Sequence, residues 1–115
     1  DPLYAALKAG VTHYTRMAGV ELGPHQIRVN SISPGAIATP IFYGGSQRAN
    51  DLTNEENERK MEKLKGNLAN AVPLKRSGLA SDIAEAALYL SSDAGSFVTC
   101  QDIVVDGGRT AMFNE

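Results

Sequence analysis

The sequence has few of the residues on which disulfides and metal sites depend. Cys100 is the only cysteine among 115 residues, so no internal disulfide can form. The two histidines, His13 and His25, lie far from any cluster of other metal ligands, and we predict no metal site. A lone cysteine fits a protein of a reducing compartment, and we expect the cytoplasm.

Long apolar runs and an excess of one charge are also missing. No apolar run approaches the roughly 20 residues of a membrane span, so we predict no membrane-embedded segment. The 11 Lys and Arg residues nearly balance 13 Asp and Glu residues, for a net charge of -2. Without a basic stripe and interleaved aromatics, we predict no nucleic-acid partner and no binding to an anionic membrane. The hydrophobic fraction of 43% is ordinary, and the length suits one domain.

Glycine is present, but not in the arrangement that binds dinucleotide phosphates. Neither G-x-x-x-G-x-G nor G-x-G-x-x-G occurs in the sequence. The chain also begins without Met, and its first strong pattern starts at Leu3 with no lead-in. We therefore expect it to be part of a longer polypeptide.

Apolar residues at helical spacing predict two firm helices. The first runs from about Pro2 to Leu22, with Pro at its first position and Gly23 in a left-handed conformation at its end. The second runs from Ser81 to Ser92, where Ser81 and Asp82 suit a helix start. We expect its buried side to be formed by Ile83, Ala84, Ala87, Leu88, Tyr89 and Leu90.

Two short segments rich in β-branched residues predict strands. The first is Ile27–Ile32, ended by Ser33-Pro34-Gly35, and the second is Asp102–Asp106, ended by Gly107-Gly108. The long helical crossover between them predicts a parallel pair in an α/β sheet. Because two strands bury little, we expect further strands from elsewhere.

The segment 41–72 predicts a polar helical excursion. Gly44-Gly45-Ser46 predicts a flexible turn, and Thr53 with Glu56 has the form of a capping box. A thin apolar stripe follows, and the helix offers two favourable i,i+4 ion pairs, Glu55–Arg59 and Glu56–Lys60. The stripe consists of Met61, Leu64, Leu68 and Val72. An ordinary solvated helix and a substrate lid both fit this pattern.

Tyr4 and Lys8 stand four residues apart at the start of the first predicted helix. This spacing places a phenol and an ammonium on one helix face. A free Tyr has a pKa near ~10, and a nearby fixed cation lowers that pKa by favouring the phenolate. Such a Tyr can give a proton to a carbonyl oxygen, or take one from an alcohol, while a nicotinamide or flavin carries the hydride. Taken alone, the pair also fits an ordinary surface helix.

Two further motifs follow in order along the chain. The segment Ser33–Thr39 (SPGAIAT) comes directly after a strand, and its Pro-Gly turn leaves backbone amides free to contact a ligand. Near the carboxy terminus, Val104–Gly108 (VVDGG) ends the last strand in a turn. Each alone fits a plain loop or turn, but the order and spacing of all three motifs are specific.

In this order the three motifs resemble the short-chain dehydrogenase/reductase family, over essentially all 115 residues. The supporting matches are Glu21–Gly23, Ile27–Asn30, Pro73–Gly78 and Asp82–Ala84. The resemblance implies an α/β fold, in which the two strands and their flanking helices are the last part of a Rossmann-like doubly wound parallel sheet. Residues 1–115 would be the carboxy-terminal portion of a single domain, with 40–72 as the variable substrate-loop region. The amino-terminal dinucleotide-binding half would be absent.

The resemblance also implies roles for particular residues. Tyr4 would be the general acid/base and one of the cofactor-binding residues, and Lys8 would lower its pKa and hydrogen-bond the nicotinamide ribose. The loop that begins at Pro34 and Gly35 would hold the carboxamide of NAD or NADP, through backbone groups at Ile37 and the hydroxyl of Thr39. The family's catalytic Ser and Asn would lie upstream of Tyr4. Cys100 stands where the family usually has Gly, which leaves the bend there open.

The function implied by the resemblance is NAD(P)-dependent oxidation or reduction of a secondary alcohol/ketone couple in a small molecule. Family members are usually dimers or tetramers, so we expect a homo-oligomer or association with a separate amino-terminal half. The helix from Pro2 to Leu22 would then pack against its twin. The alternatives are a non-catalytic fragment that serves as a structural or oligomerisation module, and an interaction module without a redox role.

Overall fold

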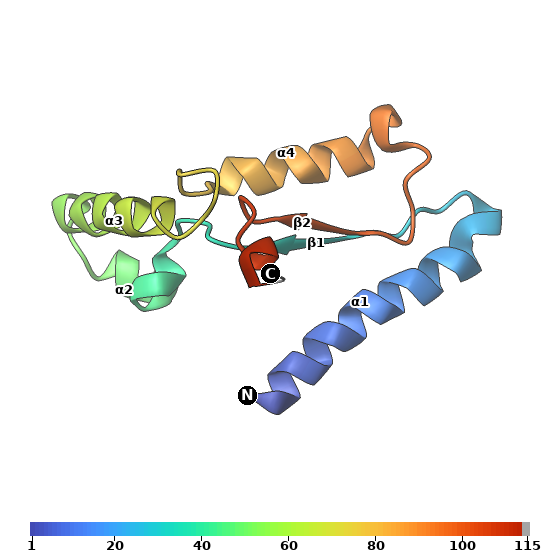
Figure 1. Cartoon of the computed structure of the whole chain (residues 1–115), viewed down its shortest axis with the longest axis horizontal. Coiled ribbons are helices and arrows are strands. Elements are labelled where there is room, and N and C mark those ends of the chain that lie inside the picture. The colour runs from blue at the N-terminus through green and yellow to red at the C-terminus, as the bar shows by residue number, and fades with distance from the viewer. Residues whose placement is uncertain (114–115) are drawn as a thin grey trace. The chain divides into compact units, whose positions relative to one another are not determined.

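The computed structural model describes residues 1–113, and Figure 1 shows its elements in chain order. The helices and strands are α1 (Pro2–Leu22), β1 (Ser31–Pro34), α2 (Gly45–Asn50), α3 (Asn54–Ala69), α4 (Ala80–Ser91) and β2 (Asp102–Val105). Short 3-10 turns cover Gly23–His25, Pro40–Tyr43, Asp93–Gly95 and Thr110–Phe113. The chain forms two compact units, the first from residues 1–33 and 85–104 and the second from 34–84 and the chain from 105 onward. Within the described residues, no helix is both long and apolar enough to cross a membrane.

Helix α1 has the predicted bounds because its start is set locally. The Asp1 carboxylate accepts a hydrogen bond of 2.8 Å from the Leu3 N–H, and Pro2 occupies the first turn. The helix ends at Leu22 as predicted, but Gly23 is right-handed at φ -54, and Gln26 is the residue that takes the left-handed conformation, at φ 62. A 3-10 turn extends the helix, since Gln26 donates its N–H to the carbonyl of Gly23.

Strands β1 and β2 pair in parallel, as predicted. Ser31 donates its N–H to the Gln101 carbonyl in the first unit, and Gly35 donates to Val105 in the second, with the same offset. The bounds of β1 differ from the predicted Ile27–Ile32. Before Ser31, one backbone bond joins the two segments, from the Cys100 N–H to the Val29 carbonyl at 2.8 Å. Side chains supply the other bonds there: the Val29 N–H donates to Thr99 Oγ1, and Asn30 donates its amide to the Val98 carbonyl. Strand β2 ends one residue earlier than predicted.

Helix α4 lies one residue earlier than predicted, but its expected buried side was wrong. Of the predicted set only Leu90 is buried, whereas Leu88 is 60% exposed and Tyr89 is 46% exposed. Periodicity shows which face of a helix is apolar, not whether the structure contains enough surface to cover it. Two four-residue strands cover little.

The excursion 41–72, in the second unit, is helical as predicted. The predicted flexible turn Gly44-Gly45-Ser46 instead forms the start of α2. Gly44 and Gly45 have φ of 111 and 85, values that favour glycine, and α2 begins at once. The capping box of α3 is confirmed by hydrogen bonds in both directions between Thr53 and Glu56.

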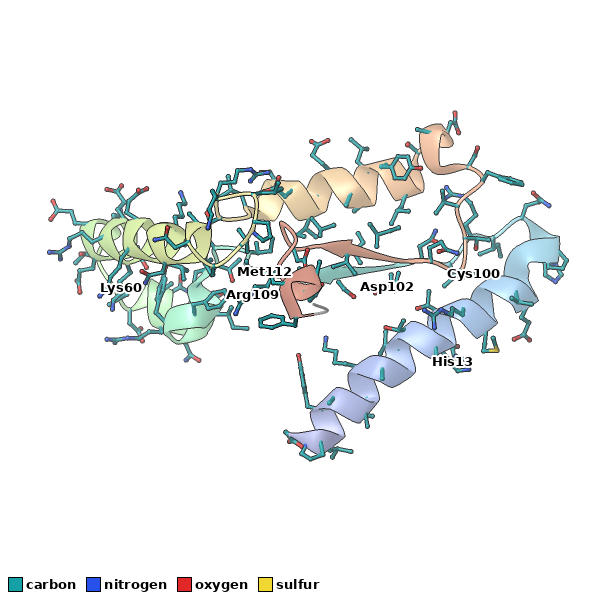
Figure 2. The ribbon with its side chains drawn as sticks, viewed as in Figure 1. His13, Lys60, Cys100, Asp102, Arg109 and Met112 are labelled. Atoms are coloured by element: carbon teal, nitrogen blue, oxygen red, sulfur yellow. The ribbon has the colours of Figure 1, made fainter. Side chains whose placement is uncertain are left out.

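The two predicted ion pairs of α3 do not form in the described chain. There the helix carries one ion pair, Glu62 to Lys65 at 3.8 Å. Glu56 is engaged by the Thr53 N–H, which removes it from Lys60. Lys60, labelled in Figure 2, instead lies with its Nζ 5.8 Å from the ring centroid of Tyr43. Of the apolar stripe, Val72 is almost fully buried and the other members are half-buried.

Candidate functional site

Tyr4 and Lys8 lie in the first turns of α1, in the first unit. The Lys8 Nζ is 5.6 Å from the centroid of the Tyr4 ring, within the range of a cation–π contact. The Tyr4 side chain is 63% exposed. Because Asp1 and Pro2 fix the helix start, the four-residue spacing brings phenol and ammonium onto one face. The predicted pair is therefore in place as a geometric unit.

The segment Pro34–Thr39 lies in the second unit, where three hydrogen bonds hold it. Gly35 donates its N–H to the Val105 carbonyl at 3.0 Å. Gly78 donates to the Ala36 carbonyl at 2.9 Å and accepts from the Ala38 N–H at 2.9 Å. This is a parallel bridge between Ile37 and Gly78, outside the named strands.

The bridge leaves the peptide groups of Ile37 unused. In a parallel pair, the residue between the two bonded neighbours turns its own N–H and C=O to the opposite side. Within residues 1–113, neither group of Ile37 makes a hydrogen bond, and the Thr39 hydroxyl makes none either. Both residues are half-buried. One donor, one acceptor and one hydroxyl within three residues are thus free to bind, a set of groups suited to a primary amide.

The segment Pro34–Thr39 packs against the turn Asp106–Gly108. A Cβ on Gly35 would come within 2.8 Å of the Asp106 Cβ, so only glycine allows this approach. Ala36, the next residue, holds a left-handed φ of 56 without being glycine. A cavity of about 100 Å³ lies between the segment and its neighbours in the second unit. Its lining includes Gly35, Ile37, Val72, Gly78, Asp82 and Asp106.

Two carboxylates of the second unit have lowered pKa values. The backbone N–H of Thr110 is the main cause of the lowered pKa of Asp106, which is buried. The pKa of Asp82 is lowered to about 2, chiefly because Arg76 donates two hydrogen bonds to it. Asp82 also accepts the Leu79 N–H at the start of α4. Asp106 thus holds the turn beside the segment, and Asp82 holds the start of α4.

The predicted site residues thus fall into two groups. Tyr4 and Lys8 lie together in the first unit, and Pro34, Gly35, Ile37 and Thr39 lie together in the second. The sequence did not predict a role for Gly78 at this site, because it stands out there only as the last residue of the motif Pro73–Gly78. Nothing in one sequence signals that Gly78 pairs with Ile37, because the pairing joins distant positions. Across the described residues, His, Cys, Asp and Glu form no group that could hold a metal.

Known proteins match the chain over nearly its whole length. A family model described as enoyl-(acyl carrier protein) reductase matches residues 1–110. The 3-oxoacyl-[acyl-carrier-protein] reductase of Chlamydia pneumoniae is 37% identical over 107 residues, which cover 93% of this chain and 37% of that protein. The short chain dehydrogenase/reductase astE of Aspergillus oryzae is 39% identical over 109 residues, covering 95% and 38%. The chain belongs to the short-chain dehydrogenase/reductase family.

A solved structure gives the same answer for the fold. A short chain dehydrogenase family protein from Francisella tularensis has a TM-score of 0.68 at 28% identity, covering 94% of this chain and 43% of that chain. The predicted α/β, Rossmann-like fold is therefore confirmed. As a member of the family, the chain spans little more than a third of the length of the curated relatives it matches.

Proposed function

We propose that this chain is the carboxy-terminal portion of an NAD(P)-dependent oxidoreductase acting on a secondary alcohol/ketone couple. Family membership and the oxidoreductase names of its relatives support the reaction class. The observation that carries the proposal is the unpaired peptide of Ile37, two residues before the unbonded hydroxyl of Thr39. The chain's share of its relatives' length and the missing Gly-rich turn support a separate amino-terminal dinucleotide-binding half.

The residues present fit the nicotinamide end of the cofactor. A carboxamide has an NH₂ that donates and a C=O that accepts, which complement the Ile37 C=O and N–H. The Thr39 hydroxyl adds a third partner, and the Pro34-Gly35 turn sets the approach of the backbone. Lys8 would bind the ribose hydroxyls. NAD and NADP share this end of the molecule, so both fit.

In the proposed reaction the chain's own residues handle the proton. When bound, the nicotinamide supplies or accepts the hydride. Tyr4 would donate its phenolic proton to the carbonyl oxygen during reduction, or accept the hydroxyl proton during oxidation. The Lys8 ammonium lies on the same helix face, with its Nζ 5.6 Å from the centroid of the Tyr4 ring.

The decisive experiment is Tyr4→Phe in the full-length enzyme. Removing a general acid/base typically lowers turnover by about 10²- to 10⁴-fold, so we expect a loss on that scale with cofactor binding retained. Tyr14→Phe is the matched control, since Tyr14 lies on the same helix and is 72% exposed. Near-normal turnover in Tyr4→Phe would refute the role of Tyr4.

The excursion 40–72 is the proposed substrate-binding region, for a small-molecule alcohol or ketone. Its side chains are diverse, and the half-buried apolar stripe of α3 supports an apolar substrate surface.

The partner surface is proposed to lie on α1, where apolar residues are exposed. These include Leu3, Leu7, Val11, Tyr14 and Val20, each more than half exposed. A homo-oligomer, or the separate amino-terminal half, would cover them.

A second candidate, a non-catalytic fragment, is favoured by how little apolar surface is buried. Among the described residues only Ala38, Val72 and Leu90 form the buried hydrophobic core. Such a chain would depend on partners for its stability. The discriminating test is a titration of the isolated 115-residue chain with NADH. Tight binding would contradict the fragment hypothesis, and no binding, together with Tyr4-dependent turnover of the full-length protein, would place the cofactor site in the assembled enzyme.

A further inference from the structure

The carboxylate of Asp106 is fully used in holding one turn. Gly108 donates its N–H to Oδ1 at 2.9 Å, and Thr110 donates both its N–H and its hydroxyl to Oδ2 at 2.8 and 2.7 Å. The side chain is only 8% exposed. Gly107 and Gly108 follow with left-handed φ of 62 and 92. A buried, charged acceptor therefore fixes a turn of unusual backbone shape.

One side of this turn supports the Pro34–Thr39 segment. The residue before Asp106, Val105, accepts the Gly35 N–H at 3.0 Å. Gly35 lies so close to Asp106 that a Cβ there would be 2.8 Å from the Asp106 Cβ. Ile37 follows two residues later. The position of the unpaired Ile37 peptide therefore depends on the position of Asp106.

The other side of the turn holds the end of the excursion. Leu74 donates its N–H to the Gly107 carbonyl at 3.3 Å, and the Arg109 guanidinium donates to the Ala71 carbonyl at 3.0 Å. Cβ atoms placed on Gly107 and Gly108 would lie 3.3 Å from Val72 and 3.0 Å from Pro73. Residues 71–74 are thus joined to the turn by hydrogen bonds and close contacts. Figure 2 labels Arg109 at this junction.

We propose that Asp106 is a positioning residue that couples the cofactor segment Pro34–Thr39 to residues 71–74, where the substrate region 40–72 ends. Both segments attach to the one turn that its carboxylate holds. A shift of the turn moves both, so substrate-side and cofactor-side geometry change together. The inference rests on the proposed function, because it takes these segments as the two sides of a reaction site.

The test uses Asp106→Ala in the full-length enzyme, with hydrogen exchange as the readout. We expect faster exchange of the amides in both 34–39 and 71–74. The dissociation constant of NAD(P)H and the substrate KM should both rise by about tenfold, the size expected when a charged hydrogen bond is lost. At saturation kcat should change little. Asp106→Asn, which keeps one carbonyl acceptor, should restore part of each effect.

The matched control is Asp82→Asn, a carboxylate of the same unit that bonds Arg76 and Leu79 and touches neither segment through a hydrogen bond. It should leave exchange in 34–39 and 71–74 unchanged. If Asp106→Ala does not fold, Thr110→Val removes only the hydroxyl bond and should show the same pattern in smaller measure.

Two results would overturn the proposal. Faster exchange confined to residues 106–113, or in only one of the two segments, would show that the turn does not couple them. A drop in active enzyme with unchanged KM and cofactor affinity would show a purely structural role. The exchange experiment needs no turnover. Near-normal turnover in Tyr4→Phe would therefore refute the catalytic role of Tyr4 without deciding the coupling, and the reverse also holds.

Discussion

The thiol of Cys100 lies against the backbone of Gly19. A Cβ placed on Gly19 would be 2.5 Å from the Cys100 Sγ, closer than two such atoms can approach. Gly19 is buried in α1, and Cys100 lies in the loop before β2, where Figure 2 labels it. The absence of a side chain at Gly19 is what allows the helix and this loop of the first unit to meet.

Gly19→Ala should therefore lower the free energy of unfolding of the full-length protein. We expect a loss of about 1–3 kcal/mol, because the new methyl group must displace the sulfur or the helix. Urea unfolding would measure it. Gly10→Ala is the control: it lies on the same helix with nothing within 4 Å of its added Cβ, and should stabilise by up to about 1 kcal/mol. Equal effects of the two changes would contradict the contact.

Replacing Cys100 with glycine should suppress the cost of Gly19→Ala. Cys100 holds a φ of 64, a conformation that favours glycine, so Cys100→Gly relieves backbone strain as well as removing the sulfur. The predicted bend is thus present without the glycine usual in the family. A double-mutant cycle on unfolding free energies should give a coupling of about 1 kcal/mol or more. Additive effects would show that the sulfur does not limit Gly19.

The ion pair of Arg76 and Asp82 should make the free energy of unfolding depend on pH. The pKa of Asp82 is lowered from 3.8 to about 2, mainly by hydrogen bonds from Arg76. A folded pKa below the unfolded one stabilises the fold above about pH 4, and this contribution is lost as the pH falls toward 2. Urea unfolding of wild type and Asp82→Asn should differ most near neutral pH and converge near pH 2. A difference that is constant over this range would contradict the assignment.

Thr53→Ala should destabilise the start of α3. The Thr53 hydroxyl accepts the Glu56 N–H at 3.1 Å, and loss of such a cap costs about 1 kcal/mol. Hydrogen exchange should speed up in the first turn of α3 and little elsewhere. Thr53→Ser keeps the hydroxyl and should behave like wild type. A similar loss in both variants would mean that the methyl group, and not the cap, matters.

Gly35→Ala should weaken cofactor binding. The added methyl would meet the Asp106 Cβ at 2.8 Å. The segment Pro34–Thr39 must therefore move away from Asp106, and Ile37 moves with it. We expect a cost of about 1–3 kcal/mol in stability, and weaker NAD(P)H affinity in fluorescence titrations. Gly66→Ala, in α3 with open space around it, should leave that affinity unchanged. Normal affinity in Gly35→Ala would argue against this segment as the carboxamide site.

The elements that could be predicted most closely are those whose signals are local. The start of α1 at Pro2 and the capping box of Thr53 follow from neighbouring residues, and the structure has both. The strand bounds were less accurate, because side chains of Asn30 and Thr99 supply several of the bonds before Ser31. The buried side of α4 could not be predicted, since burial depends on what covers the helix.

The sequence by itself determined the order of the elements, the parallel pairing and the nearness of Lys8 to Tyr4. Each follows from spacing along one segment or from the length of a crossover. Only the tertiary structure decided that the Ile37 peptide is the unpaired one, because that depends on Gly78 binding the residues on either side of it. It also decided that Gly35 rests on Asp106 and Gly19 on Cys100. These contacts join residues that are far apart in the sequence. They arise from packing, which no local pattern encodes.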